Sequence, residues 1–222
     1  MKLDFSSVWQ YWPFLYHGAV TTLKITAMAA VLGFILGVLL SLIKISKCKP
    51  LVWFGNFYTS IFRGTPLLVQ LCIVHFGLPQ LTGMTLTTMQ SGVLTFSLNS
   101  AAYISEIFRG GINAIDRGQY EAAMSLGVGY RDMMKDIILP QAVKHILPSL
   151  VNEAISLLKE SSILSYIGAV ELLRAADQIT VLTFRFFEPY LVIAVIYYVL
   201  VMLLSMVASW IERWVNRSDR VS

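Results

Sequence analysis

Long apolar stretches separated by short polar ones run through most of the chain. Residues 25–43 and 190–211 contain no charged side chain, and each is long enough for a helix across a bilayer, which takes ~20 apolar residues. A segment rich in Trp and Tyr, interrupted by Pro13, precedes the first stretch, and this composition is typical of the membrane–water interface. The pattern predicts an interfacial segment, residues 1–17, followed by a transmembrane domain, residues 18–222.

Small residues recur along the first predicted span. Gly33 and Gly37 are four positions apart, so they would lie on one helix face. Two glycines at this spacing let a second helix approach closely, and we expect another helix to pack there. The alternative is that both glycines face lipid.

The second apolar region is interrupted in its middle. Residues 51–62 and 67–78 are each too short to cross a bilayer alone at ~1.5 Å of rise per residue, and the sequence between them is Arg-Gly-Thr-Pro. Two half-helices around a Gly/Pro break predict an interrupted span whose freed backbone groups line a cavity. A plain proline kink, with Arg63 near the cytoplasmic interface, is the alternative.

Two further spans are expected, one over about residues 86–108 and one from about Ile146, with Pro148 in its first turn, where proline is tolerated. Each carries a polar stripe on one helix face. The stripes comprise Thr95, Asn99, Tyr103 and Glu106 in the third span, and Ser149, Glu153, Ser156 and Glu160 in the fourth. Such groups usually face the interior of a helix bundle, which predicts a polar lining for a substrate. Helix–helix hydrogen bonds alone are the alternative.

A polar insert, residues 109–145, lies between the third and fourth spans. Asp116 is suited to cap a short helix that Gly127 would end in a left-handed turn. A second short helix is expected from about Tyr130 to Ile138, ending before Pro140. Two short helices joined by a tight turn would protrude as a docking surface for a soluble partner. We call this insert the knuckle.

Two shorter segments are expected on the opposite, outer side of the membrane. Residues 79–84 are uncharged and predict a short turn. Residues 168–188 contain charges of both signs. They are interpreted as a surface for an external partner, a solvated loop or a re-entrant helix.

Composition agrees with a membrane protein. The 222-residue chain is 56% hydrophobic and 14% charged, whereas soluble domains average about a quarter charged residues. The net charge of +4 does not predict nucleic-acid binding, because the basic residues lie in short loops beside apolar stretches. The proposed inner side holds Lys44, Lys47, Lys49, Arg109, Arg117, Arg131, Lys135, Lys144, Arg213, Arg217 and Arg220, and the outer side holds Lys2, Arg174 and Arg185. We therefore predict an all-α, polytopic transmembrane helix bundle of about five spans, with the N-terminus outside and the C-terminus cytoplasmic.

Sequence motifs for catalysis are missing. The chain has no Gly-x-x-x-x-Gly-Lys-Ser/Thr phosphate loop, so it is not expected to hydrolyse nucleotides itself. Its three histidines and its cysteines, Cys48 and Cys72, lack metal-ligand spacing. We expect no metal and no cofactor, and we predict that the chain is not an enzyme. Because the N-terminus lacks the features of a signal peptide, it is expected to be retained.

The knuckle matches the pattern EAA-x3-G-x9-I-x-LP, with Glu-Ala-Ala at 121–123, then Gly127, Ile137 and Leu-Pro at 139–140. This pattern resembles the signature loop of permease subunits of binding-protein-dependent ABC importers. The stretches FRGTPLLVQL (62–71), AAYISEIFRGGINAIDRGQYEAA (101–123) and LPSLVNEAISLLKESSI (147–163) are similar to polar amino acid permeases of the histidine/glutamine/arginine type. One departure is Lys-Glu-Ser-Ser at 159–162, where such permeases often have Lys-Asp-Thr-Ser.

The resemblance implies a multi-pass subunit of the bacterial cytoplasmic (inner) membrane that pairs with a second copy or a sister permease. It also implies two ABC ATPase subunits beneath, an extracytoplasmic substrate-binding protein that delivers an amino acid, and ATP-driven alternating access. The knuckle would act as a coupling helix in a groove of the ATPase. The residues assigned to ATPase docking are Glu121, Ala122, Ala123, Gly127, Leu139 and Pro140.

An amino acid needs an acceptor for its ammonium group and donors for its carboxylate. Glu153 is the predicted acceptor of an ammonium or guanidinium group, which favours a cationic amino acid. Alternatively, Glu153 pairs with Arg63 or Lys159 and holds the bundle together. The predicted substrate site comprises Gly64, Thr65, Pro66, Leu67, Gln70, Asn99, Tyr103, Asn152, Glu153, Ser156, Leu157 and Glu160. The alternative function is an ATP-independent secondary transporter of amino acids or ions that uses the intramembrane charges.

Overall fold

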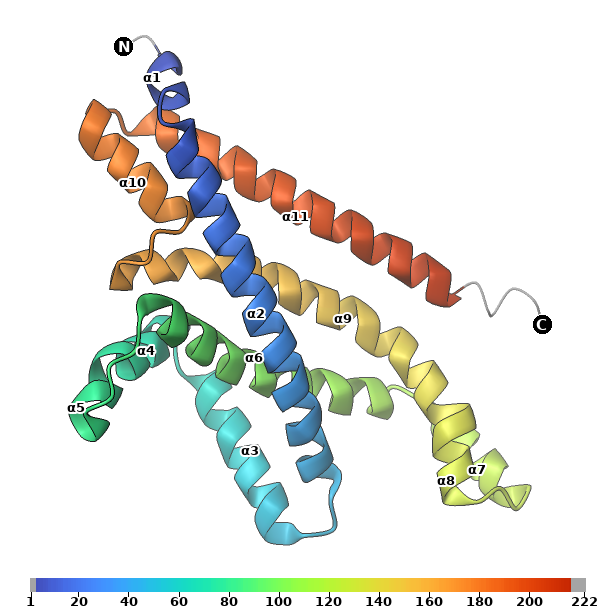
Figure 1. The fold of residues 1–222 in the computed structure, drawn as a ribbon. Coiled ribbons are helices and arrows are strands. Elements are labelled where there is room, and N and C mark those ends of the chain that lie inside the picture. Colours follow the sequence, from blue (N-terminus) through green and yellow to red (C-terminus); the bar gives the residue numbers. More distant parts are fainter. Residues whose placement is uncertain (1–2, 217–222) are drawn as a thin grey trace.

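The computed structural model describes residues 3–216, and all regular structure in this part of the chain is helical (Figure 1). The first half contains α1 (Ser6–Trp9), α2 (Trp12–Ile45), α3 (Lys49–Gly64), α4 (Leu67–Cys72), the π-helix η1 (Ile73–Gly77), α5 (Leu78–Thr82) and α6 (Thr88–Asn113). The second half contains α7 (Arg117–Ser125), α8 (Tyr130–Asp132), the π-helix η2 (Met133–Ile138), α9 (Leu139–Glu160), the 3-10 helix η3 (Ser161–Ile167), α10 (Leu172–Thr183) and α11 (Phe187–Asn216). The predicted all-α fold is confirmed.

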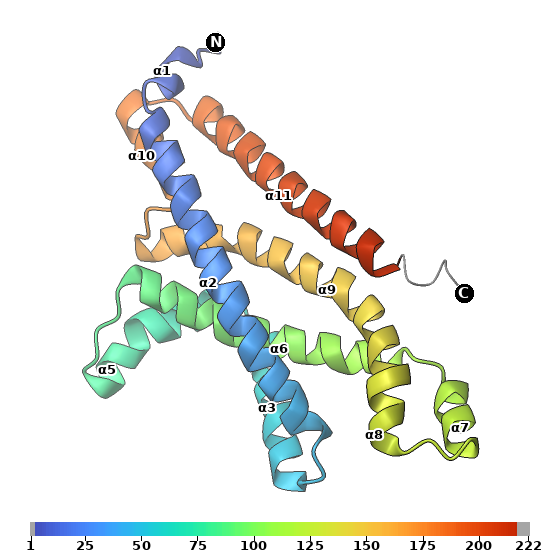
Figure 2. The same ribbon diagram turned by 45° about the vertical axis from the view of Figure 1, so that its right-hand side comes forward.

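Three long helices, α2, α6 and α9, pack against one another in the middle of the molecule (Figures 1 and 2). A cluster of buried apolar residues around Phe96 and Leu157 lies at this crossing. A second cluster, around Leu15 and Ile179, joins the start of α2 to α10 and α11. The third, around Ile138, lies under the knuckle, far from α1 and α10 (Figure 1).

The glycine face of α2 packs against α6. A Cβ atom added at Gly33 would lie 2.9 Å from Cβ of Ser100, and one added at Gly37 would lie 2.6 Å from Cγ2 of Ile104. The two backbones approach this closely because neither glycine has a side chain. The predicted helix contact is confirmed, and the alternative in which these glycines face lipid is wrong.

The interrupted second span is present and sharply bent. α3 ends at Gly64, Thr65 is extended, and Pro66 precedes α4. The helix axis turns by 105° between residues 49–64 and 67–82. A proline kink bends a helix that continues, whereas here an extended residue separates two helices. The predicted break is therefore confirmed, as a broken span or a re-entrant loop.

Three prolines occupy other places in the helices than the sequence predicted. Pro13 lies in the first turn of α2, so the expected interfacial segment runs into the first span as one 34-residue helix. The second knuckle helix does not end before Pro140, since α8, η2 and α9 are continuous. Pro148 lies inside α9 and not in a first turn. A first turn tolerates proline because its N–H groups are free anyway. The wider π turn of η2, with hydrogen bonds that span five residues, carries the helix across Pro140.

Helices form in both segments that were expected on the outer side. Residues 79–84, predicted as a turn, are mostly α5, and the turn is confined to the region of Gly83, whose φ is 73°. Residues 168–188 contain α10 (Leu172–Thr183), which lies between Gly168 and Phe184, so the interpretation as a solvated loop is wrong and a helix, which was among the alternatives, is present. The apolar face of α10 is buried against α2 and α11. This contact joins segments that are distant in sequence, so local composition did not reveal it.

Two helices, α2 and α11, are long and apolar enough to cross a membrane, and the bent pair formed by α3 and α4–α5 could be a third span. α11 confirms the helix expected at residues 190–211. Helices α6 and α9 do not meet the same criterion, and both carry polar stripes. The arrangement of about five spans with the N-terminus outside stays a prediction. Three basic residues used for it, Lys2, Arg217 and Arg220, lie outside the described residues.

Candidate functional site

The break between α3 and α4 is held by side-chain amides. The last carbonyl groups of a helix have no partner within the helix, and Pro66 has no N–H to offer. The carbonyl of Phe62 instead accepts hydrogen bonds from Gln70 Nε2 at 2.9 Å and from Asn99 Nδ2 at 3.0 Å. The carbonyl of Phe62, near the end of α3, is thereby satisfied from α4 and from α6.

The same two amides also bind each other. Asn99 Nδ2 donates to Gln70 Oε1 at 3.0 Å, and Gln70 Nε2 donates to Thr65 Oγ1 at 2.9 Å. Both amide side chains are buried. We call Phe62, Thr65, Gln70 and Asn99 the amide brace. Because its donors are used within the chain, the brace fixes the shape of the break.

Glu153 is not part of the amide brace. It belongs to α9 and contacts α6 at Ser100. Its Oε1 accepts a hydrogen bond from Ser100 Oγ at 2.7 Å. The two residues line a cavity of about 160 Å³ between α2, α6 and α9, together with Ala30, Phe34, Ile104, Leu150, Ala154 and Leu157. Arg63 pairs with Glu106, so the alternative in which Arg63 pairs with Glu153 is wrong.

A second hollow lies at the far end of α9. It measures about 350 Å³ and is lined by Ser156, Lys159, Glu160, Ser162 and Ile163. Glu153, Ser156 and Glu160 are spaced by three and four residues, so they form one polar stripe along α9. This stripe is the part of the predicted substrate site that the fold places next to open space.

The predicted substrate residues therefore divide into two groups. Asn99 and Ser100 are neighbours on α6, and successive helix residues point about 100° apart. Asn99 thus serves the amide brace while Ser100 holds Glu153. Of the other predicted residues, Gly64, Pro66, Tyr103 and Asn152 are exposed, Leu67 is half-buried and Leu157 is buried.

Sequence reasoning missed a cluster of ionic groups. Lys44, Arg63 and Arg109 all contact the carboxylate of Glu106, and we call these four residues the ion cluster. Lys44 was counted as a loop residue, whereas it belongs to the last turn of α2. The position of Glu106 in a polar stripe was the available signal, but its partners come from other helices.

The first knuckle helix has the predicted ends. Asp116 Oδ1 accepts a hydrogen bond from Gly118 N at 2.6 Å and caps α7. Gly127 has a φ of 74°, and the N–H groups of Gly127 and Val128 donate to the carbonyls of Met124 and Ala123, each at 3.0 Å. This is a Schellman ending. Both predicted boundary residues are confirmed.

The knuckle packs on an apolar cluster and exposes large apolar side chains at its tip. Ala123 is buried in the third apolar cluster, which also contains side chains of α6, η2 and α9. Glu121 and Ala122 are exposed, while Leu126 and Tyr130 are 83% and 74% exposed. Large apolar side chains at a protruding tip are typical of a protein–protein contact. Of the other residues assigned to docking, Leu139 and Pro140 are exposed in the first turn of α9.

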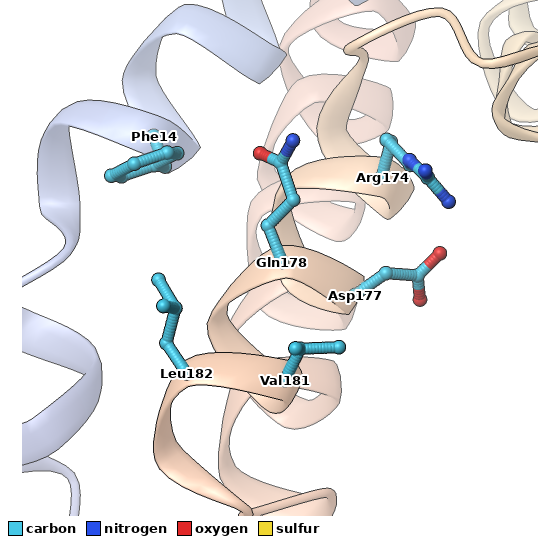
Figure 3. A pocket seen from close by; sticks show the side chains of 6 residues that line it. All are labelled: Phe14, Arg174, Asp177, Gln178, Val181 and Leu182. Carbon is cyan, nitrogen blue, oxygen red and sulfur yellow. The ribbon is translucent and has the colours of Figure 1, made fainter.

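A larger hollow, of about 420 Å³, lies between α10 and the start of α2 (Figure 3). Figure 3 shows Arg174 and Asp177 directed to the same side, away from Phe14. Asp177 Oδ1 also accepts a hydrogen bond from Tyr190 Oη at 2.5 Å. Since its charged groups do not converge on a common point, we do not assign the substrate to this hollow.

Comparison with known proteins decides the family. The profile of the binding-protein-dependent transport system inner membrane component matches residues 29–218. The chain belongs to this family. The arginine transport system permease protein ArtQ of Bacillus subtilis (strain 168) is 51% identical over 219 residues, which cover 99% of this chain and 100% of the relative. The putative glutamine transport system permease protein GlnP of Rickettsia felis is 48% identical over 200 residues, or 90% of this chain and 92% of the relative.

A solved structure agrees with the fold. The crystal structure of an amino acid ABC transporter with histidines matches with a TM-score of 0.91 at 45% sequence identity, covering 96% of this chain and 99% of that one. The resemblance inferred from the knuckle and its flanking stretches is confirmed. The chain is an inner-membrane transport component, not the ATPase, and it belongs to a system that depends on a binding protein.

Proposed function

We propose that this chain forms the translocation path for a polar amino acid in an ATP-driven importer, and that a cationic amino acid fits the path best. The observation that carries this proposal is the position of Glu153. Its carboxylate lies in a cavity between three helices and accepts a hydrogen bond from a neutral hydroxyl, that of Ser100. A carboxylate within a bundle is costly unless a cation compensates it. An ammonium or guanidinium group of a ligand would supply that cation.

The remaining polar residues of α9 extend the path. Ser156 and Glu160 continue the stripe of Glu153 into the second hollow, where they would accept donors from the substrate. Gly64 and Pro66, which are exposed at the break, would line a further part of the path, and the amide brace would hold the break in shape. The names of the relatives, an arginine and a putative glutamine permease, support the amino acid class.

The assembly we propose follows from the knuckle. Its exposed apolar tip and the exposed Glu121 would enter a groove on an ATPase, with one ATPase for each of two permease copies. An extracytoplasmic binding protein would deliver the amino acid on the other side, and five spans with an external N-terminus would place the knuckle in the cytoplasm. The second permease is either another copy of this chain or a sister subunit.

The test replaces Glu153 by Gln, a substitution that keeps the shape and removes the charge. The complete complex, with its ATPase and binding protein, is reconstituted into proteoliposomes, and ATP-dependent uptake of L-arginine and L-glutamine is measured. We expect Glu153→Gln to lower uptake of L-arginine roughly tenfold or more, because a hydrogen bond to a charged group contributes about 1.5–3 kcal/mol. Assembly and basal ATP hydrolysis should stay near the parent values.

Glu212→Gln is the matched control. Glu212 lies near the end of α11, outside both hollows, and its replacement should leave uptake unchanged. Unchanged uptake by Glu153→Gln would remove Glu153 from the site. Uptake by vesicles that contain this chain without an ATPase would favour an ATP-independent transporter.

A further inference from the structure

Glu106 is surrounded by basic side chains from three helices. Its Oε1 pairs with Lys44 Nζ of α2, and its Oε2 lies 2.6 Å from Arg109 Nη2 of α6 and 3.6 Å from Arg63 Nη1 of α3. The side chains of Lys44 and Glu106 are 4% and 18% exposed, whereas those of Arg63 and Arg109 are 44% and 53% exposed. The Lys44–Glu106 pair is therefore the buried centre of the ion cluster.

The surroundings of Lys44 accommodate its whole side chain. Lys44 Nζ donates to Thr59 Oγ1 of α3 at 3.3 Å. A Cβ atom added at Gly55 of α3 would lie 2.7 Å from Lys44 Cγ, so the glycine leaves room for the lysine stem. One buried side chain thus contacts α3 and α6 from the end of α2.

Helix α6 connects the ion cluster to both functional regions. Following Glu106, Ile107, Phe108 and Ile112 pack in the apolar cluster beneath the knuckle. Preceding it, Asn99 belongs to the amide brace and Ser100 holds Glu153. The ion cluster therefore lies between the docking surface and the proposed substrate path, at the point where α2 and α3 are tied to α6.

We propose that Glu106 is a positioning residue that makes α2 and the broken helix follow the movement of the knuckle. Separating a buried ion pair leaves an uncompensated charge, so a shift of α6 driven through the knuckle would carry Lys44 and Arg63 with it. Without the contacts of Glu106 to Lys44 and Arg63, α6 could move while α3 and the break stay in place, and ATP hydrolysis would no longer open the path. This inference rests on the proposed function and adds the coupling element to it.

The test removes both partners of the buried pair at once. In the variant Lys44→Met/Glu106→Gln no charge of the pair is left unpaired, and the replacements nearly match the original shapes. We expect a melting temperature and an L-arginine affinity close to those of the parent complex. The number of substrate molecules taken up per ATP hydrolysed should fall at least about fivefold, the low end of typical coupling between two sites.

Arg109→Gln is the control, because Arg109 pairs with Glu106 within α6 and joins no second helix. It should leave the ratio of uptake to ATP hydrolysis near the parent value. If the Met/Gln variant does not assemble, Lys44→Gln/Glu106→Gln, which keeps polar groups at both positions, is measured in the same way and should show the same loss.

A double variant that assembles and couples as well as the parent would overturn the inference and leave the pair a packing role. The same conclusion would follow if stability fell while the ratio of uptake to hydrolysis stayed constant. Absence of ATP-dependent uptake in the parent complex is a different result, because it would contradict the proposed function itself.

Discussion

The knuckle and the amide brace are both functional candidates, but they are built in different ways. The ends of α7 are set by residues that are close in sequence. The side chain of Asp116 caps the start of the helix by accepting a hydrogen bond from Gly118 N. At the other end, the N–H group of Gly127 donates to a carbonyl of the last turn. The brace joins Asn99 to the carbonyl of Phe62, 37 residues away. A locally built element keeps its form when its surroundings change. An element made of distant contacts depends on the packing of three helices and can change when those helices move.

The largest effect is expected in the brace. Asn99→Leu removes one donor from the Phe62 carbonyl and the donor to Gln70 Oε1, and only the Phe62 carbonyl keeps a second donor, Gln70 Nε2. We expect the free energy of unfolding to fall by about 2 kcal/mol, measured by thermal unfolding of the purified complex. Asn113→Leu, at the exposed end of α6, is the control and should be nearly neutral. Equal stability of both variants would show that the brace does not hold the break.

A smaller and more local effect is expected in the knuckle. Gly127 has a positive φ of 74°, where a side chain costs roughly 1–2 kcal/mol. Gly127→Ala should weaken binding of the ATPase in a pull-down assay while the thermal stability of the membrane bundle stays the same. Gly129→Ala is the matched control, because Gly129 has a φ of −62° that any residue adopts. If both variants bound the ATPase equally well, the ending of α7 would have no role in docking.

The same contrast explains what the sequence could predict. The ends of α7, the break after Gly64 and the glycine contact of α2 were all predicted, because a cap, a Gly/Pro pair and a four-residue spacing are local signals. The continuation of the helix through Pro140 and Pro148 was not predicted. Proline usually ends a helix, and here a π turn and the packing of α9 outweigh that tendency.

Side-chain partners in the bundle could be predicted only in part. The polar stripes correctly marked Asn99, Glu106 and Glu153 as facing the interior. They did not show that Asn99 would serve a backbone carbonyl or that Glu106 would bind Lys44, because both partners come from other helices. Lys44 looked like a loop residue, since basic residues beside an apolar stretch usually mark the membrane surface.

One measurement tests the central claim that the knuckle lies in the cytoplasm and binds the ATPase that drives transport. Cysteine is placed at Ala122, an exposed position of α7, after Cys48 and Cys72 are replaced by Ser, and a short cross-linker is added to membranes that contain the whole complex. We expect a cross-link to the ATPase and no labelling of this cysteine by a membrane-impermeant reagent added from outside. Labelling from outside, or cross-linking to no ATPase, would contradict it.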